Sequence, residues 1–419
     1  MLLRNLRIAD LTARAWASGD IRVADGVITE TGPGLSAGAD QVIECDGRFA
    51  VPGMIDAHIH LRATGHIGPT AQVPVPDGDG ATDPAALLGR LHGFLYCGVT
   101  SVYDAGNDPA VILPRRQAER DGRIVSPRIF CTGSLLTCPG GHGSQFGFTH
   151  TGGLDDFFAA DPDIVKITYD EHGWGVRPLI PILSPRELRA LIDASHQHRR
   201  RVTVHVSNEL RARQAVAADA DSLAHPVIQS PVTDEFCWLL AAKRIPVVST
   251  LAIGERYPRL ADHPDFLDGP LYAACLSGEE RAQLRGAESA RQRENRWADW
   301  MRVMTPVAQD NLRRVVAAGG TVVTGTDLSL GADYHRELEL LQDAGLGPWD
   351  VLCCATVNGA AFLGRTDLGA LAPGHAADLV LLDSDPGQDA RNLSAIWRVA
   401  KGGQLIDRHA LKLPPAAGQ

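Results

Sequence analysis

Residues 51–60 read Val51-Pro-Gly-Met-Ile-Asp-Ala-His-Ile-His60, and this stretch decides the fold that we predict. It is an apolar run that ends in two histidines separated by one residue. Side chains at positions i and i+2 of a strand point to the same face, so His58 and His60 can both reach one metal ion. The stretch therefore predicts a strand with metal ligands at its carboxyl end.

Further apolar, β-branched runs follow and alternate with amphipathic segments such as residues 184–198, where Ser184 and Glu187 predict a helix-capping box. This alternation predicts a parallel sheet or barrel. Four runs end in another candidate ligand: Asp163-Ile-Val-Lys166, Thr203-Val-His205, Ser222-Leu-Ala-His225 and Gly325-Thr-Asp327. At about 30 residues per strand–helix unit, the ligands fall on barrel strands 1, 4, 5, 6 and 8. Barrel active sites form at the carboxyl ends of the strands, so the ligands should meet there.

The two ends of the chain carry a strand pattern without helices. Near the start, apolar residues flank Asp25-Gly26, a hairpin turn signal, and residues 378–382 and 396–399 resume the pattern near the other end. We expect an α/β protein: a (β/α)8 TIM barrel over 54–366, and a small β-sandwich built from 1–53 and 367–419.

Residues 254–300 are rich in Arg, Asp and Glu and are expected to be an insertion in the barrel. Apolar side chains recur at helical spacing at its end, at Trp297, Trp300, Met301 and Met304. The pattern favours a helix that packs this stripe onto the barrel. A lid that offers aromatic contacts to a substrate is the alternative.

Composition narrows the functional classes. The 419 residues include 40 Lys and Arg against 50 Asp and Glu, a net charge of −10, and they form no basic block. A nucleic-acid partner is therefore not expected. No apolar run approaches the roughly 20 residues that span a bilayer, so we expect no membrane segment. The eight cysteines form no C-x-x-C pair, and no secretion signal is evident, so we expect reduced thiols and a cytoplasmic protein.

Lys166 lies inside the apolar run Ile164-Val-Lys-Ile167. A buried lysine charge is costly unless paired, and burial lowers the pKa of the amine. A neutral amine can add carbon dioxide to form a carbamate, an anion whose two oxygens can bridge two cations. Pairing of Lys166 with a carboxylate in the barrel is the alternative interpretation.

The motifs together resemble the metal-dependent amidohydrolase superfamily, in its binuclear branch with a carbamylated lysine. Residues 51–60 match its first strand, Gly98-Val-Thr-Ser-Val102 its second, and residues 369–383 its returning β domain. Residues 126–130, 140–143 and 335–341 are similar to the imidazolonepropionase-related group, which includes Xaa-Pro dipeptidases and ochratoxinase-type amidases.

The resemblance implies a ligand set and cofactors. The residues that match His58, His60 and Asp327 hold one metal ion in that family. Those that match His205 and His225 hold the other, and the carbamylated lysine that matches Lys166 bridges them. We therefore expect two divalent ions, zinc in the first place, and a carbamate on Lys166.

Two departures from the family bear on the substrate. Mononuclear deaminases carry a catalytic glutamate three residues after the strand 5 histidine, whereas this chain has Asn208 there and Glu209 one residue later. The loop from Tyr169 to Arg177 is less rich in glycine than in the relatives, and Tyr169 and Arg177 are expected substrate contacts.

These features predict a hydrolase that cleaves the amide C–N bond of a small molecule, such as an N-acyl amino acid, a dipeptide or a related amide. A hydroxide bridging the metals attacks the carbonyl, and Asp327 takes up the proton and returns it to the leaving nitrogen. His142, in Cys138-Pro-Gly-Gly-His-Gly-Ser144, is expected to donate a hydrogen bond to the developing oxyanion.

Other functions stay open at this point. The same metals could hydrolyse a lactone, a carbamate or another ester, and cyclic amide hydrolysis and deamination are further alternatives. A non-catalytic scaffold would be expected to have lost ligands, yet all six positions are filled. We expect a small-molecule substrate and a homo-oligomer.

Overall fold

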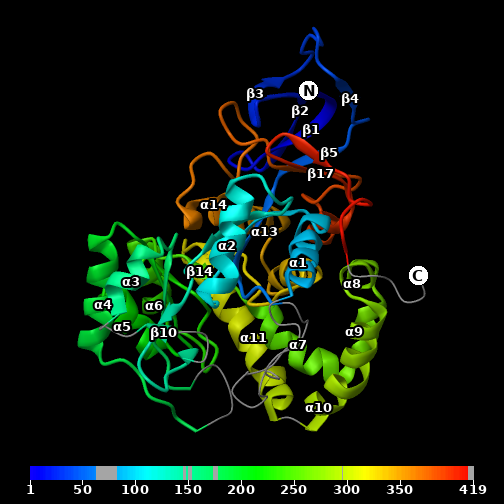
Figure 1. Cartoon of the computed structure of the whole chain (residues 1–419). Helices are drawn as coiled ribbons and strands as arrows, with labels where there is room; N and C mark the ends of the chain where they lie inside the picture. Colours follow the sequence, from blue (N-terminus) through cyan, green and yellow to red (C-terminus); the bar gives the residue numbers. More distant parts are fainter. Residues whose placement is uncertain (63–82, 145–147, 150–152, 173–177, 295, 414–419) are drawn as a thin grey trace.

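Strands from both ends of the chain lie together in one sheet, drawn in blue and red at the top of Figure 1. This computed structural model describes residues 1–62, 83–144, 148–149, 153–172, 178–294 and 296–413. The sheet has the order β18-β17-β16-β5-β1-β2-β3, and β4 also pairs with β1. Its strands are β1 (Leu2–Asp10), β2 (Ala15–Ala24), β3 (Val27–Gly32), β4 (Val42–Glu44), β5 (Phe49–Pro52), β16 (Leu379–Leu382), β17 (Ile396–Lys401) and β18 (Gln404–Ile406).

The sheet curls around a small core of its own. The two ends of the chain join where β5 pairs antiparallel with β16, with Pro52 opposite Leu379. The Ala377 amide also donates to the Gly26 carbonyl at 2.9 Å, which links the β2–β3 turn to the stretch before β16. The enclosed core contains Leu3, Leu6, Ile8, Ile21, Val23, Ile28, Cys45, Ala50, Leu371, Ala377, Leu379, Leu381 and Ala400. The expected β domain from both termini is therefore present.

Eight short parallel strands make up the second part of the molecule. They are β6 (Met54–Ile59), β7 (Val99–Asp104), β8 (Arg128–Cys131), β11 (Val165–Thr168), β12 (Val202–His205), β13 (Ser222–Leu223), β14 (Val247–Val248) and β15 (Val322–Val323). Consecutive strands pair in parallel from β6 to β8 and from β11 to β15. The Asp163 amide donates to Cys131 between β8 and β11, and the Ala57 amide donates to Thr324 between β15 and β6, both at 2.9 Å. This is the strand order of the predicted (β/α)8 barrel.

Helices follow the barrel strands and cover them, as Figure 1 shows. They are α1 (Pro84–Tyr96), α2 (Pro109–Arg120), α3 (Leu154–Ala159), α4 (Pro185–Gln197), α5 (Glu209–Ala217), α6 (Asp234–Lys243), α7 (Leu251–Asp262), α11 (Arg296–Ala317), α12 (Gly331–Asp343), α13 (Pro348–Ala355) and α14 (Val357–Leu363). Ser184 and Glu187 form the predicted capping box of α4. Of two further short strands, β9 (Leu135–Leu136) pairs with β11, and β10 (Phe148–Thr149) pairs with β9.

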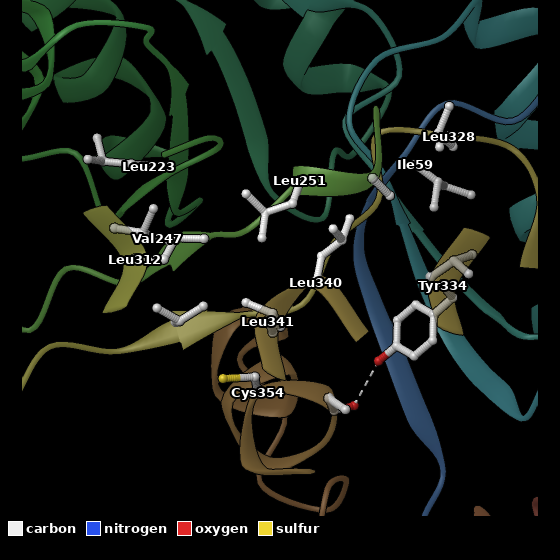
Figure 2. Packing of buried hydrophobic residues seen from close by; sticks show 14 of the residues in the cluster. Ile59, Leu223, Val247, Leu251, Leu312, Leu328, Tyr334, Leu340, Leu341 and Cys354 are labelled. Carbon is white, nitrogen blue, oxygen red and sulfur yellow. Dashed lines mark hydrogen bonds between the residues drawn. The ribbon is translucent and has the colours of Figure 1, made fainter. Parts of the chain in front are cut away.

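The main core lies between the barrel strands and these helices. Figure 2 shows Leu251, Leu312, Leu340 and Leu341, from three helices, packed near Val247 of β14. The buried Tyr334 hydroxyl donates to the carbonyls of Ile55 at 3.0 Å and Ala355 at 3.3 Å. This satisfies its polar end and ties α12 to β6 and α13.

A group of short helices connects α7 to α11 at the lower right of Figure 1. They are η3 (Pro264–Asp268), α8 (Pro270–Cys275), α9 (Gly278–Gln283), η4 (Leu284–Glu288) and α10 (Ser289–Glu294); η5 (Ala390–Ser394) lies outside this group. Met301 is fully buried, and Trp297, Trp300 and Met304 pack against the main core. The stripe therefore packs onto the barrel, as its spacing favours.

Within the described residues, no helix combines the length and apolar character needed to cross a bilayer. All eight cysteines are described, none forms a disulfide, and seven of them are buried.

Candidate metal centre

The six residues predicted as ligands lie on five different strands or just after them, and they converge at the carboxyl end of the barrel. One ligand atom each from His58, His225 and Asp327 lies within 4.8 Å of the others. The His60 Nε2 atom is 3.1 Å from the Asp327 carboxylate, and the Lys166 Nζ atom is 3.1 Å from His58 Nε2. The His205 ring lies 4.4 Å from the His225 ring, measured between centroids.

Asp327 reaches this cluster through an unusual backbone conformation. Its φ is +58°, in the left-handed region that non-glycine residues rarely adopt. The amides of Thr326 and Asp327 both donate to the His58 carbonyl, at 3.1 and 2.7 Å, and hold the turn in place. Strain that the surroundings stabilise in this way is common at functional sites.

Each ligand histidine has one ring nitrogen held by an outer partner. Nδ1 of His58 lies 3.0 Å from the Ala224 carbonyl, and Nδ1 of His60 lies 2.7 Å from the Gly106 carbonyl. Nδ1 of His225 lies 2.9 Å from the Thr250 hydroxyl. Outer partners of this kind fix the tautomer and the ring orientation of a metal-binding histidine.

Asp170 is the outer partner of His205, and the sequence reasoning missed it. Its side chain is buried, and its Oδ2 atom lies 3.1 Å from His205 Nε2. The signal was the strand period, because Asp170 stands two and four residues after Thr168 and Lys166, which face the barrel interior.

Burial and charge set the protonation of the cluster. Burial lowers the pKa of Lys166 to about 7, far below that of an exposed lysine. Burial also lowers the pKa of His58, His205 and His225, so these rings are neutral. For Asp327, burial raises the pKa, but the adjacent imidazoles of His58 and His60 outweigh this and hold it below its usual range. Neutral imidazoles and an ionised carboxylate are the forms that bind metals, and the uncharged fraction of the amine, substantial at neutral pH, is the form that adds carbon dioxide.

His142 lies beside this cluster. Its ring centroid is 4.3 Å from that of His205, and its backbone carbonyl accepts a hydrogen bond from the Thr168 hydroxyl at 2.8 Å. The following Gly143 has φ of +79°, and a Cβ atom there would lie 2.7 Å from Leu135 Cδ2. This position therefore requires glycine, and the tight turn brings His142 to the metal ligands.

The two other expected substrate contacts have different outcomes. Tyr169 is fully buried and donates from its hydroxyl to Gln214 of α5 at 3.0 Å, so it points into the helix layer and does not join the cluster. Its place in the strand explains this, since it alternates with the inward-facing Thr168 and Asp170. Arg177 lies outside the described residues.

Arg62 is a further charged group that the sequence reasoning overlooked. It continues the alternation of His58 and His60 by one more step, and it interacts electrostatically with Asp327 and Asp104. The positive charge of Arg62 therefore acts on the ligand carboxylate.

Comparison with known proteins agrees with this geometry. The Amidohydrolase family model matches residues 49–407, so the chain belongs to the amidohydrolase family. The predicted family and the predicted class of enzyme, a hydrolase acting on carbon–nitrogen bonds, are both confirmed.

The individual relatives share about a quarter of their residues with this chain. An adenine deaminase of Deinococcus deserti is 25% identical over 389 residues, 91% of this chain and 56% of the relative. This chain therefore spans little more than half of that relative's length. The ochratoxinase of Aspergillus niger is 23% identical over 397 residues, 85% of this chain and 75% of the relative.

Solved structures support the fold. A prolidase complexed with N-methylphosphonate-L-proline superimposes with a TM-score of 0.77 at 22% identity, over 97% of this chain and 98% of the prolidase. A molinate hydrolase gives a TM-score of 0.75 at 19% identity, over 99% of this chain and 96% of the other.

Proposed function

We propose that this protein is a binuclear metal-dependent amidohydrolase that cleaves the amide C–N bond of a small molecule. The observation that carries the proposal is the meeting of six potential ligands from five strands around one point, with the Lys166 amine 3.1 Å from His58. In our proposal, His58, His60 and Asp327 would hold one ion, His205 and His225 would hold the other, and a carbamate on Lys166 would serve both.

The side chains fit divalent metal ions. The set offers imidazole nitrogens and one carboxylate, which zinc prefers, and every imidazole is fixed by an outer partner. His58 and Lys166 place two nitrogens 3.1 Å apart in a buried site, and burial has lowered the pKa of both groups. A carbamate on this amine would add anionic oxygen ligands to the set.

Divalent ions in this site would act as Lewis acids, activating water and polarising the substrate carbonyl. Asp327 accepts the proton of the attacking water on its carboxylate and passes it to the leaving nitrogen. That transfer is needed because an amide nitrogen leaves as an amine only after it gains a proton. His142, beside His205, donates a hydrogen bond to the carbonyl oxygen as negative charge develops on it.

The proposed substrate carries a carboxylate next to the scissile amide, as N-acyl amino acids and dipeptides do. Arg62 is the group that supports this choice, since its guanidinium interacts electrostatically with Asp327. A planar guanidinium matches the two oxygens of a carboxylate, and this contact would orient the amide toward the metal ligands.

Deamination is the second candidate, because the adenine deaminase relative matches most of this chain. Two contacts argue against it. Asn208 accepts a hydrogen bond from the Arg211 amide and caps α5, and Glu209 binds the Thr233 hydroxyl at 2.7 Å and Arg213. Neither side chain is available as the acid–base group of a deaminase.

One experiment tests the proposal and its alternatives. Purified protein loaded with zinc should hold close to two metal ions per chain and hydrolyse members of a panel of N-acyl amino acids, dipeptides and cyclic amides. Matched esters, lactones and carbamates test the alternative hydrolases, and adenine tests deamination. Fully active protein with one ion per chain would contradict the binuclear site.

Lys166→Ala is the variant that addresses the bridge. It should lose most activity, and added short carboxylic acids should restore part of it by taking the place of the carbamate. Lys243→Ala, on the partly exposed end of α6, is the control and should behave as the unmodified protein. Full activity of Lys166→Ala would refute the bridging role.

A further inference from the structure

Asp170 forms a buried network that none of the proposed catalytic steps uses. Its Oδ2 atom accepts a hydrogen bond from His205 Nε2, at a distance of 3.1 Å. Its Oδ1 atom accepts from the Ser207 hydroxyl at 2.8 Å and from the His172 amide at 3.0 Å. Asp170 and His205 are 1% and 3% exposed, so water does not compete for these bonds. These three donors compensate for the cost of burying the carboxylate.

The network extends to a third loop. Gln229 donates from its side-chain amide to the Ser207 hydroxyl at 2.8 Å, and the Ile228 amide donates to the Ser207 carbonyl at 3.0 Å. Asp170, Ser207 and Gln229 follow β11, β12 and β13, the strands that carry or precede Lys166, His205 and His225. The network thus connects the loops that follow three ligand-bearing strands.

The contact with Asp170 also sets the orientation of the His205 ring. His58, His60 and His225 all use Nδ1 for their outer partner, which leaves Nε2 for a metal ion. His205 is the opposite case, because its Nε2 carries the proton that Asp170 accepts. Its metal-binding lone pair is therefore on Nδ1.

We propose that Asp170 is a positioning residue: it fixes His205 in the tautomer that binds metal through Nδ1 and, through Ser207 and Gln229, holds the second metal site together. This inference rests on the proposed binuclear function. Without Asp170, either ring nitrogen of His205 can carry the proton, and the ring can rotate. The ion held by His205 and His225 is then bound more weakly than the ion at His58, His60 and Asp327.

Metal titration of the full chain with zinc and with cobalt tests this assignment. Asp170→Ala should bind one ion as the unmodified protein does and the second ion about 10–100-fold more weakly. The absorption spectrum of the cobalt-loaded Asp170→Ala protein should also differ from that of the cobalt-loaded unmodified protein. Ser207→Ala keeps the carboxylate but removes one of its donors, and it should weaken the second ion by a smaller factor. Ser207→Ala also tests the proposal if Asp170→Ala does not fold.

The control is Asp221→Asn, because Asp221 also pairs with a histidine, at 2.9 Å from Nε2 of the exposed His196 of α4, but lies near the start of β12, where it accepts from the Val202 amide. It should leave both affinities unchanged. If the unmodified protein binds two ions and both Asp170→Ala and Ser207→Ala bind them equally tightly, Asp170 has no positioning role. If the unmodified protein binds fewer than two ions, the proposed function itself fails, and this outcome is distinguishable from the first.

Discussion

Asp327 and Thr250 are two non-glycine residues held in left-handed backbone conformations, with φ of +58° and +37°. Each contacts the metal cluster: Asp327 offers a carboxylate, and Thr250 binds Nδ1 of His225 at 2.9 Å. Such conformations cost roughly 1–3 kcal/mol each and persist only where surrounding contacts over-determine them. The two strained conformations lower the stability of the fold, and they direct the Asp327 and Thr250 side chains to the metal cluster.

Asp327→Asn should bind metal less tightly and lose hydrolysis by several orders of magnitude. The change removes a negative ligand and the group that transfers the proton, and proton transfer alone is worth about 10²–10⁴-fold. Steady-state kinetics and metal content should be measured together, with the exposed Asp310→Asn as control. Near-normal turnover by Asp327→Asn would refute its assigned role.

His142→Ala should retain both metal ions and lose about 10²–10³ in kcat, because one well-placed donor to an oxyanion contributes that much. His142→Gln keeps a donor and should lose less. A normal kcat in His142→Ala with a full metal content would show that the histidine does not contact the reacting carbonyl.

At the scale of elements, α7 begins without a side-chain cap of its own. The buried Glu337 of α12 supplies one, accepting from the amides of Leu251 at 3.0 Å and Ala252 at 2.6 Å. Burial raises the pKa of Glu337 to about 7, although these amides oppose the rise. The start of α7, next to the partner of His225, therefore depends on a carboxyl group from another helix.

This contact gives a pH dependence of stability. The folded state binds the Glu337 proton more tightly than the unfolded chain, whose pKa is near 4.5. The protonated Glu337 side chain therefore contributes fully to the free energy of unfolding below pH 4.5. This contribution is lost as the pH rises through 7. From pH 5 to 8, the metal-free protein should lose up to about 3 kcal/mol of unfolding free energy relative to Glu337→Gln.

Urea denaturation of both proteins at pH 5, 6.5 and 8 measures this difference. Glu339→Gln, on the same helix, is the control and should follow the unmodified protein at each pH. A constant difference between Glu337→Gln and the unmodified protein across this range would show that Glu337 does not titrate there.

The sequence predicted the ligand strands because polar residues at the ends of apolar runs are a local pattern with a simple geometric meaning. His58, His60, Lys166, His205, His225 and Asp327 do come together. Tyr169 alternates with the inward-facing Thr168 and Asp170, so the strand period directs its side chain to the helix layer, although β11 itself ends at Thr168. The strand period directs Asp170 to the barrel interior, but it does not name His205 as the partner, because that contact joins residues 35 positions apart, one after β11 and one at the end of β12.

At the scale of the whole molecule, the terminal sheet contacts the barrel through a paired charge. Arg128, at the start of β8, donates from Nε and Nη2 to the Asp378 carboxylate at 2.8 and 3.0 Å. The Gly402 amide binds the same carboxylate at 2.6 Å, and Asp378 is 5% exposed. This bidentate pair fixes how the two parts meet.

Asp378→Asn should lower the unfolding free energy by about 3 kcal/mol, because it leaves a largely buried guanidinium without its counter-charge. Asp310→Asn breaks an exposed pair with Arg313 and should cost less than about 0.5 kcal/mol. Chemical denaturation of the three proteins makes the comparison. Equal losses in both variants would show that the Arg128 pair does not stabilise the contact between the two parts.

The pairing of β5 with β16 also bears on how the chain acquires its structure during synthesis. β5 leaves the ribosome early, but its partner, which begins at Leu379, follows only after the whole barrel has been made. At about 5–20 residues per second, the delay is on the order of tens of seconds. Throughout that time the free edge of β5 is open to pairing with another chain. A nascent chain halted before β16 is therefore expected to aggregate more readily than the complete chain, even where its barrel has already folded.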